Sequence, residues 1–151
     1  MRLAIVAVGR QRAGPLKELE RHYAERITFP LVIREVEEKR KLSAAEMKAR
    51  EAALLLDAVP EGATVVALDG RGKTLSSADL AQRLERWRQG AGDLAFLIGG
   101  AEGLHDSVLE KASLVLSLGA MTWPHLLVRG MLLEQIYRAQ QILAGHPYHR
   151  A

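Results

Sequence analysis

Residues 94–103 have the sequence LAFLIGGAEG, in which five consecutive apolar residues run into a glycine-rich turn. An apolar run of this length that ends at glycine is typical of a strand buried on both faces of a sheet. Other apolar runs in the chain predict four more strands. These runs cover residues 3–8, 31–36, 64–68 and 114–118.

Helical segments separate the predicted strands. Two of them begin at serine caps, Ser43 and Ser76, each followed three residues later by an acidic residue that supports the first turn. The expected helices cover about 15–26, 43–59, the segment from 76 onward, 105–112 and 125–143, and 69–72 is expected to be a loop. This alternation predicts an α/β fold in which a mostly parallel sheet carries helices on both faces. Residues 1–151 are expected to form one domain.

The composition excludes several classes of protein. The chain has 151 residues and no cysteine, so disulfides, thiolate metal sites and cysteine nucleophiles are ruled out. No apolar run approaches the ~18 residues that span a bilayer, and the N-terminal run lacks a signal-peptide cleavage site, so we expect a cytoplasmic protein. The net charge of +3 permits a polyanionic partner without demonstrating one.

Three motif-like segments fail on closer inspection. Gly72-Lys73-Thr74 resembles the end of a phosphate-binding P-loop, but Ala67 stands where the first glycine of that motif is required. No G-x-G-x-x-G follows the first strand, which disfavours a Rossmann dinucleotide site. His146 and His149 are spaced like metal ligands but lack the further ligands of a zinc site, so we expect no metal.

The last third of the chain carries the candidate ligand site. Two loops of small residues, 99–103 and 119–123, follow successive predicted strands, and the loop after Leu68 is expected beside them. In α/β sheets, ligands gather outside the carboxyl ends of the strands. Because glycine permits close approach of the backbone, these loops suit a flat heterocycle held by backbone groups between apolar side chains. Tight turns alone would give the same composition.

The last predicted helix is apolar on more than one side. This pattern favours contact with both the sheet and a second subunit over burial within a single subunit. His125 and Arg129 share one face of the helix, and Glu134 and Arg138 are also four residues apart. These pairs indicate a polar patch beside the loops, with a capping histidine and a surface ion pair as the alternative.

The C-terminal tail combines an aromatic ring, an imidazole and a guanidinium at Tyr148, His149 and Arg150. Such groups can stack on a base and pair with phosphate. A disordered terminus is the alternative.

Short motifs along most of the chain together carry a family resemblance. They are Leu3–Gly9, Leu68-Asp69, Gly72-Lys73, Leu97–Leu104, Ser117-Leu118, Met121-Thr122, Pro124-His125, Val128-Arg129, Tyr137–Ala139 and His146–Arg150. In these motifs and in length the chain resembles the ribosomal RNA large subunit methyltransferase H family. Members of this family are knotted (SPOUT) enzymes that methylate the N3 position of a pseudouridine in 23S ribosomal RNA.

The resemblance implies a C-terminal trefoil knot, a homodimer and S-adenosylmethionine as the cofactor. The RNA partner would be 23S rRNA in the large ribosomal subunit or the assembled ribosome, with no membrane and no metal involved. The implied cofactor contacts are Leu68, Gly99, Gly100, Gly103, Leu118, Gly119, Ala120, Met121, Thr122 and Trp123. The family often has serine in place of Gly119 and an aliphatic residue in place of Trp123, so backbone contacts should persist while the pocket wall differs.

The resemblance also implies that the tail of one subunit completes the site of the other. Substrate contacts are then expected from Tyr148, His149, Arg150, Arg129 and Arg138. The catalytic candidates are His125, His149 and Arg150. Either histidine could accept a proton near neutral pH, and an arginine could hold phosphate or stabilise negative charge.

Three other functions remain as alternatives. A knotted methyltransferase could act on the 2′-oxygen of transfer RNA, although the small size leaves no added RNA-binding domain. A ribosome-binding factor could retain the fold without catalysis, although the glycine loops and the tail are intact. A nucleotide-binding α/β enzyme is disfavoured by the failed phosphate motifs. Cofactor binding and methyl transfer discriminate among these functions.

Overall fold

The computed structural model describes residues 1–151 and contains a sheet of five parallel strands. The strands are β1 (Leu3–Val8), β2 (Leu31–Val36), β3 (Thr64–Thr74), β4 (Leu94–Ile98) and β5 (Leu114–Ser117). The helices are α1 (Pro15–Ala24), α2 (Ala44–Asp57), α3 (Ser77–Gln89), α4 (Asp106–Lys111) and α5 (His125–Leu143). The predicted α/β alternation and parallel sheet are confirmed, and the helix ends differ from the prediction by only one or two residues.

The strand order β2-β1-β4-β3-β5 places β4 at the centre of the sheet. Leu94 at the start of β4 pairs with Leu3 of β1 on one side and with Thr64 of β3 on the other. Every residue of β1 and β4 is buried, which explains why both strands are apolar without alternation.

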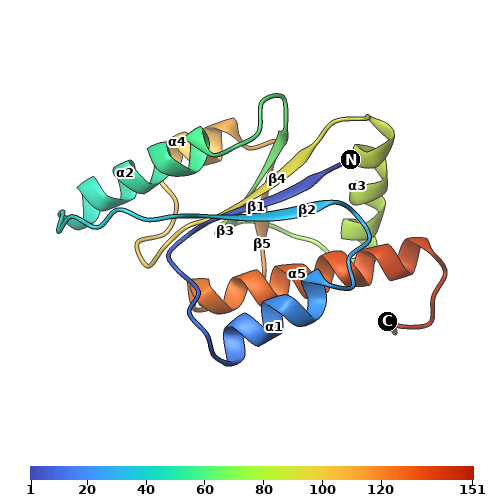
Figure 1. The fold of residues 1–151 in the computed structure, drawn as a ribbon. Coiled ribbons are helices and arrows are strands. Elements are labelled where there is room, and N and C mark those ends of the chain that lie inside the picture. Colours follow the sequence, from blue (N-terminus) through green and yellow to red (C-terminus); the bar gives the residue numbers. More distant parts are fainter.

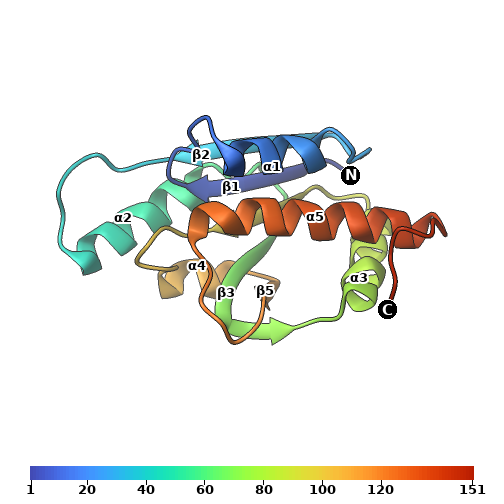
Figure 2. The same cartoon turned by 90° about the horizontal axis from the view of Figure 1, so that it is seen from below.

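Helices cover both faces of the sheet, as Figures 1 and 2 show. α1, α3 and α5 pack on one face, where Ile5 and Phe96 belong to the larger apolar core. α2 and α4 pack on the other face, where Val6 and Leu97 belong to a second core. Neighbouring residues of one strand therefore enter different cores, as the alternation of side chains along a strand requires.

Residues 69–72 are not the loop that we predicted. β3 continues through them to Thr74, and its pairing with β5 shifts register between Leu68 and Lys73. Gly72 makes the second part of this pairing possible, since a Cβ there would lie 2.3 Å from the carbonyl oxygen of Val115. Gly72, one of the two glycines that suggested a loop, instead allows close strand approach at an irregularity of the sheet.

The long helix α5 packs against α1 and α3, and the chain turns back beyond its C-terminal end (Figure 2). Gly130 permits the contact with α1, because a Cβ there would lie 2.5 Å from Cδ2 of Leu19. The knot and the second subunit stay predictions. None of the helices combines the length and the hydropathy that a membrane span requires.

Candidate active site

A cavity of about 310 Å³ lies at the carboxyl edge of the sheet, beside the ends of β4 and β5 and the middle of β3. It is enclosed by the segments that follow β4 and β5, by Leu68–Gly70 of β3, and by His125 and Val128 at the start of α5. All the predicted cofactor contacts line it: Leu68, Gly99, Gly100, Gly103, Leu118, Gly119, Ala120, Met121, Thr122 and Trp123. The structure thus brings three separate stretches of sequence into one pocket, and their role in cofactor binding stays a prediction.

The turn after β4 forms one wall and depends on glycine. Gly103 has a positive φ of 79° and donates its amide to the carbonyl of Gly100 at 3.0 Å. A Cβ on Gly99 would lie 2.9 Å from the backbone of Gly103. The turn is therefore tight enough to present backbone groups directly to a ligand.

A buried carboxyl group supports this turn from behind. A Cβ on Gly100 would lie 3.1 and 3.2 Å from the two carboxylate oxygens of Glu51, a buried residue of α2. Burial, followed by the nearby charge of Glu102, raises the pKa of Glu51. The carboxyl group is therefore easier to protonate than an exposed glutamate, which reduces negative charge behind the cavity.

The turn after β5 forms the opposite wall. Gly119 has a positive φ of 113°, and its amide donates to the hydroxyl of Ser117 at 3.2 Å. The indole of Trp123 donates to the carbonyl of Leu118 at 3.3 Å, so this side chain braces the turn. Met121 is 74% exposed and Trp123 is 39% exposed, which leaves apolar surface at the rim of the cavity.

Arg129, which we predicted as a substrate contact, does not reach the molecular surface. Its side chain is fully buried, and it donates to Glu35 at 2.5 Å and to the carbonyls of Val8 and Gly9 at 3.2 and 2.8 Å. This guanidinium therefore joins α5 to the ends of β1 and β2. It cannot reach an RNA phosphate, because its charge is paired with Glu35 and two backbone carbonyls inside the protein. We therefore assign Arg129 to the scaffold and not to the substrate site.

Glu35 is the main counter-charge of Arg129. Burial alone would raise its pKa, but the bond from Arg129, the amide of Gln11 and the charge of Lys17 together hold the pKa below its usual value. The glutamate therefore stays ionised at neutral pH and fixes Arg129 beneath the cavity.

His125 lies between this buried cluster and the cavity. Its Nε2 would be 3.3 Å from a Cβ on Gly9, and its side chain lines the cavity wall. Burial, followed by the positive charge of Arg129, lowers the pKa of His125. The imidazole is therefore neutral at pH 7 and does not repel a bound cation.

The other predicted substrate residues gather at the far end of α5. The phenol of Tyr148 donates to Glu134 Oε1 at 3.1 Å, and its ring meets that of Tyr137 edge-on at 4.8 Å. Arg138 lies 4.9 Å from the ring centre of Tyr148 and 3.1 Å from Nδ1 of His149. Burial and the neighbouring side chains raise the pKa of Tyr148, so the phenol stays protonated.

This tail cluster does not reach the cavity of its own chain. His125 and Arg138 are thirteen residues apart on α5, which corresponds to roughly 20 Å along a helix. Arg150 is exposed and makes no ion pair. The resemblance implied that the tail completes the site of another subunit, and within a single chain the structure does separate the two groups.

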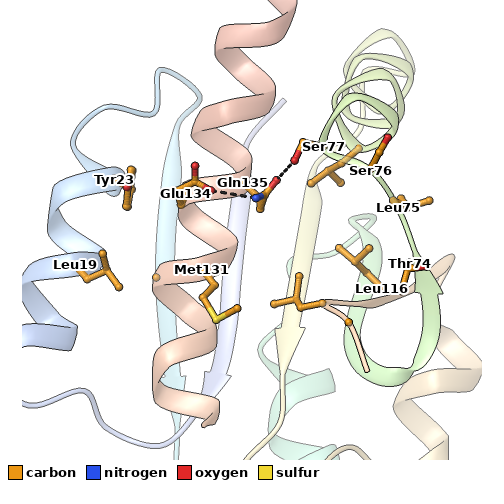
Figure 3. Close-up of a pocket in the computed structure, with 14 residues that line it drawn as sticks. Leu19, Tyr23, Thr74, Leu75, Ser76, Ser77, Leu116, Met131, Glu134 and Gln135 are labelled. Atoms are coloured by element: carbon orange, nitrogen blue, oxygen red, sulfur yellow. Dashed lines mark hydrogen bonds between the residues drawn. The ribbon is translucent and has the colours of Figure 1, made fainter. Parts of the chain in front are cut away.

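A second cavity, of about 540 Å³, lies between the two groups (Figure 3). Its lining includes Leu116, Leu118 and Gly119, which also border the first cavity, and Glu134, which holds Tyr148. Ser77 donates to Gln135 across it at 2.6 Å. This cavity was not predicted from the sequence, because its walls come from α1, α3, α5 and two strand ends. Its position connects the first cavity with the tail cluster.

The family of the chain follows from comparison with known proteins. Residues 1–149 match the family model described as predicted SPOUT methyltransferase. The chain therefore belongs to the SPOUT methyltransferase family. It is 58% identical to the ribosomal RNA large subunit methyltransferase H of Paramagnetospirillum magneticum over 99% of both chains. It is 57% identical to the protein of that name from Rhodospirillum centenum over the whole of both chains.

Solved structures share the fold at low sequence identity. A methylase family protein from Haemophilus influenzae superposes with a TM-score of 0.61 at 12% identity, over 99% of this chain and 70% of that one. A methylase family protein from Neisseria gonorrhoeae gives 0.56 at 11% identity, over 99% and 87%. The methyltransferase AviRb from Streptomyces viridochromogenes, in complex with AdoMet, gives 0.50 at 14% identity, over 93% and 58%.

Proposed function

We propose that this chain, as one SPOUT domain, transfers a methyl group from S-adenosylmethionine to N3 of a pseudouridine in 23S ribosomal RNA. The observation that carries the proposal is the cavity at the carboxyl edge of the sheet, where two glycine-containing turns meet residues Leu68–Gly70 of β3. Relatives with the same length and more than half of their residues in common bear the name of a large subunit rRNA methyltransferase. A ribosomal substrate also implies a cytoplasmic protein.

The cavity suits the cofactor in size and in chemistry. Its volume of about 310 Å³ lies at the lower end of the range for small-molecule sites, roughly 300–1,000 Å³. The turns at Gly99–Gly103 and Leu118–Trp123 offer backbone donors and acceptors between apolar side chains. S-adenosylmethionine supplies a methyl group that is already activated on a sulfonium, and the neutral His125 beside it adds no positive charge.

The protein must then orient the base and assist loss of its N3 proton. His125 lines the cavity in its neutral form and is one candidate for the proton acceptor. His149 is the other catalytic candidate, and in the arrangement seen here it would donate a hydrogen bond to the base and not accept the proton. In this arrangement Arg138 donates to its Nδ1, so the neutral ring carries its proton on Nε2. That tautomer favours a hydrogen bond to negative charge on the base, with Tyr148 and Arg150 beside it for the RNA.

The distance between the two halves of the site supports a homodimer. The tail cluster and the cavity lie at opposite ends of α5, so one chain cannot supply both to a single nucleotide. A second copy running the other way along α5 would bring its tail to the first cavity. The 540 Å³ cavity beside α5, with Leu19, Leu80 and Met131 in its lining, offers apolar surface for that copy.

The decisive experiment uses labelled S-adenosylmethionine and ribosomes from a strain that lacks the corresponding methyltransferase. Large subunits and assembled ribosomes are compared as substrates, and the modified nucleotide is mapped by mass spectrometry. We expect label on the base of one pseudouridine in 23S rRNA. Label on a 2′-oxygen or on transfer RNA would replace the proposal with another knotted methyltransferase. Cofactor binding without transfer to any RNA would favour a non-catalytic ribosome-binding factor.

A further inference from the structure

We propose that Arg10 and Arg12, in the loop between β1 and α1, clamp an RNA phosphate beside the cofactor cavity. The inference rests on the proposed function, because it assigns these residues to the docking of the same RNA substrate. Both side chains are exposed, and neither lies within 4.0 Å of a carboxylate anywhere in the described chain. Two unpaired guanidinium groups on one short loop are an anion-binding arrangement that the protein itself does not use.

The loop that carries them is held from inside by three contacts. The backbone amide of Gln11 donates to Glu35 Oε2 at 2.7 Å, and its side-chain amide donates to the carbonyl of Leu126 at 2.8 Å. The guanidinium of Arg129 donates to the carbonyl of Gly9 at 2.8 Å. Gln11 is buried, so its two neighbours in sequence point outward from a fixed backbone. A fixed loop lowers the entropic cost of engaging a phosphate.

The loop also lies at the correct place for the substrate. A Cβ on Gly9 would lie 3.3 Å from Nε2 of His125, which lines the cofactor cavity, and the side chain of Gln11 donates to Leu126 in the first turn of α5. Figures 1 and 2 both show this loop beside the N-terminal end of α5. A nucleotide whose base approaches the cavity past His125 therefore brings its backbone phosphates close to Arg10 and Arg12.

Arg71 offers an instructive contrast near the same cavity. Its guanidinium is bonded to Asp69 at 2.8 Å and to Asp106 at 3.3 Å. The hydrogen bond from Arg71 lowers the pKa of Asp69, so that carboxylate stays ionised and neutralises the arginine. Arg71 serves the fold of the turn, whereas the charges of Arg10 and Arg12 are available to RNA.

The test compares the double variant Arg10→Ala/Arg12→Ala with a matched control, Arg86→Ala/Lys111→Ala. The control removes the same charge from exposed positions at the ends of α3 and α4, on the opposite edge of the sheet. Each variant is assayed for methylation of ribosomes from 50 to 300 mM salt, for ribosome co-sedimentation and for S-adenosylmethionine affinity by calorimetry. Thermal unfolding checks that both variants fold.

We expect the loop variant to raise KM for ribosomes about tenfold near physiological salt and to leave cofactor affinity unchanged. Loss of two phosphate contacts should also flatten the slope of log(kcat/KM) against log(salt) by about 1.4–1.8. The control should match the wild type in every assay. A loop variant with the wild-type KM and salt slope would overturn the inference. If the wild type methylates no pseudouridine, the proposed function fails, and the co-sedimentation comparison still decides whether the clamp exists.

Discussion

Arg129 is a fully buried cation whose interactions link several elements of the fold. It is fully buried and holds Glu35 and two backbone carbonyls, while Glu20 of α1 lies 4.0 Å from its Nη1. The carboxylate oxygens of Glu20 make no hydrogen bond, so they depend on the charge of Arg129. One guanidinium thus holds α1, β1, β2 and α5 together below the cofactor cavity.

Removal of this guanidinium should cost far more than removal of a surface arginine. We expect Arg129→Met to lower the free energy of unfolding by about 3–5 kcal/mol, because it leaves the buried carboxylate of Glu20 without a counter-charge and removes the ion pair with Glu35. The control is Arg88→Met, which breaks an exposed pair with Glu85 and should cost about 0–1 kcal/mol. Urea denaturation measures both. Similar losses in the two variants would argue against the scaffold role.

His125 makes stability depend on pH in a defined direction. Its pKa in the folded protein lies below the ordinary value of 6.5, so the unfolded chain binds more protons between the two values. Its contribution is therefore complete above pH 6.5 and is lost as the pH falls below that value. We expect wild-type protein to lose more stability between pH 7.5 and 5.5 than His125→Gln does. Urea denaturation at both pH values tests this, and parallel losses would contradict it.

At the scale of single elements, the irregular strand β3 requires glycine at position 72, because no side chain fits there. A Cβ on Gly72 would lie 2.3 Å from the oxygen and 2.5 Å from the carbon of the Val115 carbonyl. Neither atom can move without separating β3 from β5. A Cβ on Gly70, two residues earlier in the same strand, meets nothing within 4 Å.

This contrast predicts different costs for two identical substitutions. Gly72→Ala should lower the free energy of unfolding by at least about 1–3 kcal/mol, since the overlap falls on backbone. Gly70→Ala should change it by less than about 1 kcal/mol. Thermal unfolding of the two variants measures the difference. Equal stability would mean that residues 69–74 do not pair with β5 in solution.

The same strand illustrates what a local pattern can predict. The apolar runs predicted all five strands, because burial on both faces leaves its mark on every residue of a strand such as β4. The extension of β3 has no apolar run in its sequence, since it depends on pairing with Leu116 and Ser117 more than forty residues away.

The candidate site also has a part that local sequence predicts and a part that it does not. The glycine turns predicted the cavity, because each turn is a local feature at the end of its own strand. The roles of Gln11 and Arg129 depend on partners 94 to 121 residues away, so their sequence neighbours give no signal. The sequence predicted Arg129 as a substrate contact, whereas its hydrogen bonds to Glu35 and Val8 hold it inside the protein.

At the scale of the whole molecule, the cavity and the tail cluster lie at opposite ends of α5, so under the proposed function a complete site requires two chains. Deletion of residues 148–151 should abolish methylation and preserve cofactor binding, because the tail packs on α5 and not on the cavity wall. Ala120→Arg should abolish cofactor binding, because it places a bulky cation at an exposed position of the cavity rim. Each variant alone is therefore expected to be inactive.

A mixture of the two inactive variants tests the composite site directly. In a mixed dimer, the deleted chain contributes an intact cavity and the Ala120→Arg chain contributes an intact tail, so one of the two sites is complete. Random exchange of subunits makes half of the dimers mixed, and activity should return to about a quarter of the wild-type value. Sites built within one chain would leave the mixture inactive. Full turnover by the deleted chain alone would show that the tail takes no part in the reaction.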